Sequence, residues 1–126
     1  MRVLLDPTAL SVAGGVSDLA FTPKVQHLLE DPDTVLVSPI SFMEIAITAN
    51  RGLVAFTWKH LESLVFDLNL TVLPMNAEPS MGLFGLPAHH QDPFDRALIA
   101  IALAESVPLV AKDREFKKYK GLRTIW

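Results

Sequence analysis

Five short apolar runs are spread along the chain and are separated by segments with helical periodicity. The runs cover residues 2–6, 34–38, 70–73, 109–112 and 123–125. Each run is largely apolar rather than strictly alternating, which is typical of strands in a sheet covered on both faces. Strands that alternate with helices favour parallel pairing. The sequence therefore predicts an α/β fold with a parallel sheet of four to five strands between helical layers.

Prolines and polar capping residues predict where the helices lie. We expect helices from Pro23 to Asp31-Pro32, from the N-cap Ser38 to before Gly52, over 57–68, over 77–84, and from the N-cap Asp92 to Glu105. Proline suits a first helical position because its missing N–H would have no partner there. In outline, the expected order has two helices in each of the first three gaps between strands and one in the last.

The composition fits one folded domain over residues 1–126. The absence of cysteine excludes disulfides and thiolate metal ligands. No apolar run approaches the ~20 residues needed to span a bilayer, so we expect no membrane segment. Half of the residues are hydrophobic and the mean hydropathy is +0.32, which indicates a dense core and a hydrophobic partner surface left over. A cytoplasmic protein fits these features.

Four acidic residues lie at the ends of apolar segments or within them. Asp6 and Asp113 end predicted strands, Glu44 stands among apolar residues of a predicted helix, and Asp95 opens another helix. Ligands of parallel sheets collect at the carboxyl ends of the strands, so all four are expected to face one crevice. The alternative is that they are helix caps and surface turns.

A shared cation would explain several such acids at once. Two carboxylates about 4 Å apart repel by roughly 4 kcal/mol at an effective dielectric of about 20, and otherwise hold protons with raised pKa values. Oxygen ligands without cysteine favour Mg²⁺ or Mn²⁺. Such an ion lowers the pKa of a water and stabilises charge on a phosphoryl oxygen, which suits phosphodiester hydrolysis.

The charge is unevenly distributed along the chain. Residues 112–123 hold six basic residues against two acidic ones, whereas the rest of the chain holds five against twelve. A basic tail beside an acidic pocket suits a polyanionic substrate. An ordinary solvated lysine face is the alternative.

Several motifs resemble those of PIN-domain proteins and, more closely, of the VapC toxins of bacterial and archaeal toxin–antitoxin pairs. The motifs are Leu4–Asp6, Ser41–Ile47, Pro87–Ala100, Leu109–Phe116 and the terminal Thr124–Trp126. The resemblance covers nearly the whole chain, and Pro87–Arg96 is its most specific part. It implies a PIN-like three-layer α/β/α sandwich.

The resemblance also implies an activity, a cofactor and partners. The activity is that of a Mg²⁺- or Mn²⁺-dependent ribonuclease that cleaves RNA and arrests translation. The partners are a cognate VapB-like antitoxin, which wraps the toxin and inserts a segment into the crevice, and a second copy in a homodimer. Carried over by motif, the residues that hold the metal and orient the attacking water are Asp6, Glu44, Asp95 and Asp113.

The chain departs from the family pattern at two positions. Pro7 and Thr8 follow Asp6 where the family commonly has threonine and then a polar residue, and Thr48 replaces a common lysine. These departures favour an alternative, a catalytically weakened PIN-fold module that binds RNA or protein. A second alternative is an aspartyl-phosphate enzyme with Asp6 as nucleophile.

Further residues are expected around the acids. Asp92 is expected to cap its helix by accepting from the N–H of Asp95, in addition to any contact with the metal. Thr8 would supply a hydroxyl beside Asp6, and Arg96 either binds phosphate or pairs with a carboxylate. The expected RNA contacts are the basic residues Arg96, Arg114 and Lys117.

The histidines and aromatic residues are given structural roles. Because adjacent residues point apart in an extended loop, His89 and His90 are expected in a surface loop, touching RNA or antitoxin, rather than as a metal-binding pair. Four aromatic residues are expected in the core rather than as base-stacking platforms: Trp58, Phe66, Phe84 and Phe94.

Overall fold

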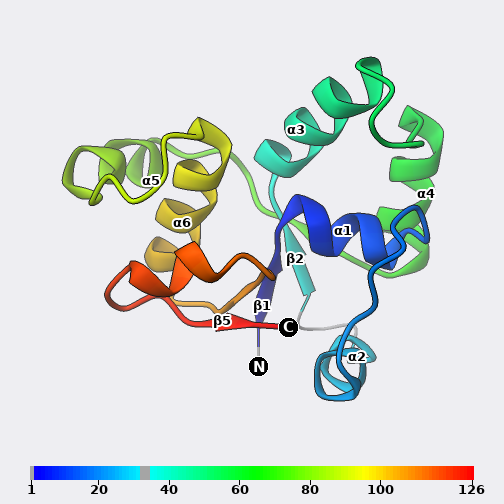
Figure 1. The fold of residues 1–126 in the computed structure, drawn as a ribbon, viewed down its shortest axis with the longest axis horizontal. Helices are drawn as coiled ribbons and strands as arrows, with labels where there is room; N and C mark the ends of the chain where they lie inside the picture. Colours follow the sequence, from blue (N-terminus) through cyan, green and yellow to red (C-terminus); the bar gives the residue numbers. More distant parts are fainter. Residues whose placement is uncertain (1, 32–34) are drawn as a thin grey trace.

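The structure is a computed structural model that describes residues 2–31 and 35–126 (Figure 1). Its elements are β1 (Val3–Leu5), α1 (Pro7–Ala13), α2 (Pro23–Leu29), β2 (Val35–Val37), α3 (Pro39–Asn50), α4 (Trp58–Asp67), β3 (Thr71–Val72), α5 (Ala77–Gly82), η1 (Leu83–Gly85), α6 (Pro93–Glu105), β4 (Leu109–Val110), η2 (Arg114–Lys118) and β5 (Thr124–Ile125). The η elements are 3₁₀ helices. The five strands lie where the apolar runs predicted them, each within the expected range; residue 34 and Pro32 fall outside the described residues.

The strands form one parallel sheet in the order β3-β2-β1-β4-β5. Strand β1 is central, since Leu4 pairs with Leu36 of β2 on one side and with Leu109 of β4 on the other. Strands β3 and β5 continue the sheet in parallel on either side. The predicted parallel α/β architecture is confirmed.

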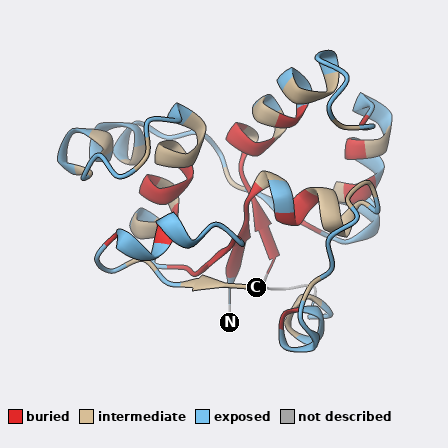
Figure 2. Ribbon diagram, viewed as in Figure 1, coloured by how far each residue is buried: buried red, intermediate tan, exposed pale blue. Residues whose placement is uncertain are grey.

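Two hydrophobic cores, one on each face of the sheet, make the three layers. Val3 and Leu5 pack with Leu10 of α1 and with buried residues of α2 and α4. Leu4, which points to the opposite face, packs with Leu98 of α6 and with buried residues around η2. Figure 2 shows the buried inner strands β1 and β2 between partly exposed helices. Because both faces are covered, the strands read as continuous apolar runs.

Four helices, α1, α2, α3 and α6, begin with a polar cap followed by proline, and two of these caps directly follow a strand. Oδ1 of Asp6 accepts from the backbone N–H of Ala9 at 2.7 Å, and Oγ of Ser38 accepts from Ile40 at 3.1 Å. Asp92 caps α6 as predicted, but its carboxylate accepts from the N–H of Phe94 at 2.8 Å rather than from that of Asp95. The helix α1 was expected only as one of two helices after the first strand, without boundaries.

The expected burial of the aromatic side chains is wrong for three of the four. Trp58, Phe66 and Phe84 are 75%, 85% and 90% exposed. Phe94 is partly buried against the core that surrounds α6, as expected. Met43, the apolar residue that precedes Glu44, is half exposed. None of the described helices combines the length and apolar character that crossing a membrane requires.

Candidate metal centre

The acidic residues gather where the strand order reverses. From β1 the chain builds the sheet outward through β2 and β3, and then returns to add β4 and β5 on the other side. The crevice beyond the carboxyl ends of β1 and β4 is therefore a topological switch point, where open α/β sheets bind ligands. Asp6 directly follows β1, and Asp113 stands three residues after β4.

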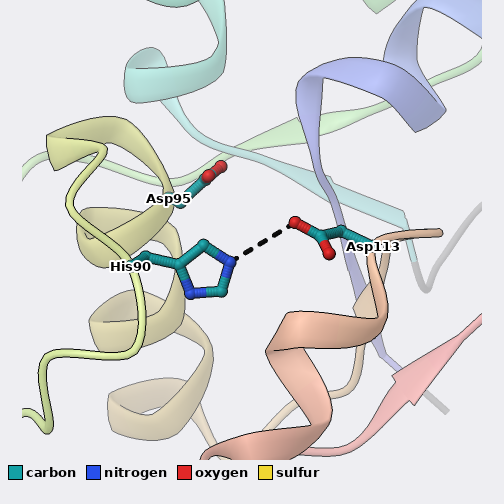
Figure 3. A group of neighbouring side chains, drawn as sticks. All are labelled: His90, Asp95 and Asp113. Atoms are coloured by element: carbon teal, nitrogen blue, oxygen red, sulfur yellow. Dashed lines mark hydrogen bonds and ion pairs between the residues drawn. The ribbon is translucent and has the colours of Figure 1, made fainter.

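Two helices bring further carboxylates to this crevice. Glu44 lies on α3 and Asp95 in the first turn of α6, and these helices contact each other. Carboxylate oxygens of Glu44, Asp92 and Asp95 lie within 4.8 Å of one another. Asp95 also belongs to a second group, in which its oxygen lies within 4.8 Å of ligand atoms of Asp113 and His90. Figure 3 shows the three side chains of this second group pointing into the same space.

Asp6 is the most buried acid of the cluster, with only 6% of its surface exposed to solvent. Burial raises the pKa of its carboxyl from 3.8 to about 7; the N–H groups of Ala9 and Thr8 oppose this, while the charges of Asp95 and Glu44 add to it. The Coulombic coupling to both acids places Asp6 in the same cluster.

The other acids also resist ionisation. Burial, followed by repulsion from Asp95 and Asp92, raises the pKa of Glu44 from 4.5 to about 7. Burial, followed by repulsion from Asp92, raises the pKa of Asp95 to about 6, and His90 partly offsets this. Three carboxyls with raised pKa values in one crevice mean that the negative charge there lacks compensation from the protein.

The donor set fits a hard divalent cation. The two groups contain four carboxylates, which bind Mg²⁺ and Mn²⁺ as oxygen ligands, and no thiol is present in the chain. Of the four acids predicted from the sequence, Glu44, Asp95 and Asp113 belong to these groups, and Asp6 interacts with Glu44 and Asp95 through its charge. Asp92, expected mainly as a cap, contributes an oxygen to the first of these groups as well.

His90 is the site residue that the sequence reasoning missed. Its imidazole is not directed to solvent, because its side chain is only 8% exposed and Nε2 lies 3.4 Å from Oδ2 of Asp113. His89 is exposed and lies edge-on to the ring of Tyr119, 4.9 Å between centroids. The two neighbours thus point apart as expected, but only one of them is a surface residue.

Among the described residues, Arg96 forms hydrogen bonds with backbone carbonyls instead of pairing with a carboxylate. Its guanidinium donates to the backbone carbonyls of Leu86, Pro87 and His90 at 3.3, 3.0 and 3.4 Å. These hydrogen bonds hold the loop that precedes α6 in place. The contact of Arg96 with RNA stays a prediction.

The remaining predicted residues lie near the crevice. Arg114 and Lys117 are exposed on η2, which begins immediately after Asp113, and their contact with RNA stays a prediction. Thr8 is exposed and reaches Asp6 through its backbone N–H, so a role for its hydroxyl is untested. The hydroxyl of Thr48 donates to the carbonyl of Glu44 at 2.6 Å.

Comparison with known proteins agrees with this fold. The family model described as "PIN domain" matches residues 8–122, and the chain belongs to this family. Comparison with curated proteins finds no match.

Three solved structures share the fold. VapBC2 from Rickettsia felis, bound to a DNA fragment from its promoter, aligns with a TM-score of 0.73 and 17% identity over 98% of this chain and 97% of that one. DNA-bound VapBC from Salmonella typhimurium aligns with a TM-score of 0.70 and 15% identity over 98% of this chain and 96% of that one. PAE2754 from Pyrobaculum aerophilum aligns with a TM-score of 0.63 and 16% identity over 99% of this chain and 91% of that one.

Proposed function

We propose that the protein is a VapC-like ribonuclease toxin that uses Mg²⁺ or Mn²⁺ to hydrolyse phosphodiester bonds in RNA and so inhibits translation. The observation that carries the proposal is the convergence of Asp6, Glu44, Asp95 and Asp113 from four different elements, with raised pKa values at three of them. Membership of the PIN domain family supports it, because PIN domains are typically nucleases.

The residues of the crevice would have different roles in the reaction. The four carboxylates would hold the cation, which when bound lowers the pKa of a water and neutralises charge on the phosphodiester. The hydrogen bond from the N–H of Ala9 would keep the buried carboxylate of Asp6 in a fixed position beside the cation. Arg114 and Lys117, which are exposed on η2, would contact the RNA backbone, whose charge the acids alone would repel.

We also propose an antitoxin as protein partner. The structural neighbours from Rickettsia felis and Salmonella typhimurium are VapBC complexes. On this chain, Phe42, Trp58, Leu61, Val65 and Val72 line an apolar groove between α3, α4 and β3. Exposed apolar grooves mark protein interaction sites. Since α3 carries both Phe42 and Glu44, a partner seated here would lie on the helix that also lines the crevice. A homodimer is a further expectation from the resemblance, and a cytoplasmic location is a further expectation from the composition.

The test is cleavage by the purified protein of a panel of structured RNAs with Mg²⁺, Mn²⁺ or EDTA. We expect cleavage with a divalent ion that is lost in Asp95→Asn and kept in Lys118→Ala, an exposed control. Toxicity on expression should follow the same pattern. Cleavage that survives Asp95→Asn or EDTA would contradict the proposal.

The weakened module remains a second candidate because of one observation. The position where relatives commonly carry a lysine is Thr48, whose hydroxyl is already engaged by the carbonyl of Glu44. This module would bind RNA or a protein without cutting in any metal. The same RNA panel, read for binding as well as for cleavage, separates the two candidates.

A further inference from the structure

His90 is held on several sides beside the acidic cluster. Its ring stacks on Phe116, with centroids 4.8 Å apart and planes at 22°, and lies 5.5 Å from the ring of Tyr119. Arg96 donates to its backbone carbonyl. Phe116 and Tyr119 are three residues apart along a 3₁₀ segment, a spacing that puts both on one face. The imidazole therefore has a fixed position and orientation.

The Tyr119 hydroxyl indicates which imidazole nitrogen carries the proton. Its oxygen accepts from the backbone N–H of His90 at 2.9 Å and lies 3.0 Å from Nδ1 of the same residue. Tyr119 is 2% exposed, and the described part of the chain offers its hydroxyl no other partner. A buried O–H without an acceptor is costly, so the hydroxyl donates to Nδ1. The neutral imidazole then carries its proton on Nε2.

This proton is directed at Asp113. Nε2 of His90 lies 3.4 Å from Oδ2, while Oδ1 accepts from the backbone N–H of Glu115 at 2.9 Å. Both oxygens of Asp113 are thus held, although its side chain is 48% exposed. Each carboxylate oxygen has a second lone pair, so Asp113 can still offer an oxygen toward Asp95.

We propose that His90 is a positioning residue for Asp113. It orients this carboxylate from outside the shell of metal ligands, and Tyr119 sets the tautomer that lets it do so. The inference rests on the proposed function, since only a metal-binding Asp113 needs this orientation. Hydrogen-bond partners of metal ligands typically change metal affinity by about 10–100-fold when they are removed.

The test is Mn²⁺ binding to the full chain, measured as free ion by electron paramagnetic resonance, with spin-echo modulation of the bound ion to detect bonded nitrogen. We expect His90→Leu to weaken Mn²⁺ binding about tenfold. His90→Gln should keep most of the affinity, because its amide can donate from near the Nε2 position. Tyr119→Phe removes only the hydroxyl and should weaken binding in the same direction. His89→Gln, the adjacent exposed histidine, is the matched control and should bind as the native chain does.

The expected native spectrum shows no nitrogen bonded directly to Mn²⁺. Directly bonded nitrogen would overturn the proposal, because it would make His90 a ligand. Native affinity in both His90→Leu and Tyr119→Phe, with folding confirmed by circular dichroism, would also overturn it. If that result accompanies loss of Mn²⁺ binding in Asp95→Asn, only the positioning role fails. If the native chain binds no Mn²⁺, the proposed metal-dependent function fails with it.

Discussion

The carboxyl ends of β1 and β4 lie side by side in the sheet, yet they surround their acids differently. Asp6 follows β1, is 6% exposed, and has a pKa raised to about 7. Asp113 follows β4, has a side chain that is 48% exposed, and faces the imidazole of His90. Both cap the helical segment that comes next, through Ala9 and Glu115 respectively.

The difference shows two ways of holding a carboxylate in place at the proposed metal site. Asp6 is fixed by burial, which costs stability whenever the group is charged and no cation is present. Asp113 stays near solvent, and its orientation comes from hydrogen bonds instead. Asp6 should therefore have the larger effect on the free energy of unfolding, and Asp113 should mainly change the affinity for the metal.

Replacing the buried acid should have the largest effect. In Asp6→Asn we expect RNA cleavage to fall by on the order of 100-fold or more. Asn keeps an oxygen for the Ala9 N–H but removes the buried charge, so the metal-free protein should become more stable at pH 8, by on the order of 1–3 kcal/mol. Cleavage assays and urea unfolding in EDTA measure the two effects. Lower metal-free stability in the variant would contradict the role assigned to burial.

The metal-free protein should lose stability as the pH rises. The folded pKa values of Asp6, Glu44 and Asp95 are raised to about 7, 7 and 6, so the folded state binds protons more tightly than the unfolded chain. Their contribution is complete below about pH 4 and disappears as the pH rises through 6 to 7. Unfolding midpoints from pH 4.5 to 8 in EDTA should show this decline.

Saturating Mn²⁺ should reverse that decline near pH 8, by about 2.7 kcal/mol at a hundredfold excess over its dissociation constant. A flat profile in EDTA, or equal stabilisation by Mn²⁺ at pH 4.5 and at pH 8, would argue against the cluster as the cation site.

Asp113→Asn should change the affinity for Mn²⁺ rather than the stability of the metal-free protein. We expect weaker Mn²⁺ binding, by about tenfold, because one ligand becomes neutral. Its metal-free stability should stay within about 0.5 kcal/mol of the native value, since the group is half exposed and Asn still caps η2. Calorimetric titration and unfolding in EDTA test both parts. A rise in stability as large as that of Asp6→Asn would remove the distinction between the two strand ends.

Lys118→Ala should have the smallest effect. Its ammonium lies 2.6 Å from Glu115, but both side chains are about half exposed. Such pairs contribute about 0.2–1 kcal/mol. Unfolding should show a loss within this range, with native metal affinity. A tenfold change in Mn²⁺ binding would mean that η2 influences Asp113 through this pair.

The sequence allowed the acids to be predicted because each is marked locally. An acid that closes an apolar run, as Asp6 does, stands at a strand end, and parallel strands present these ends at one edge. His90 could not be assigned in this way. Its position depends on a hydrogen bond to Tyr119, 29 residues away, and no local pattern encodes that contact.

Hydrophobicity also failed to separate core from surface. Leu61 and Leu64 of α4 are buried, whereas Trp58 and Phe66 of the same helix are exposed. In a single sequence, an apolar side chain on a partner-binding surface cannot be distinguished from one in the core. The high mean hydropathy anticipated such a surface without locating it.

The pairing of β1 with β4 has a consequence for synthesis of the chain. It joins Leu4 to Leu109, more than a hundred residues away along the chain. A ribosome must therefore translate the chain as far as Leu109 before these two strands can pair. An emerging polypeptide carries Asp6 long before it carries Asp95 or Asp113, so the acidic cluster cannot assemble until Asp113 has been made.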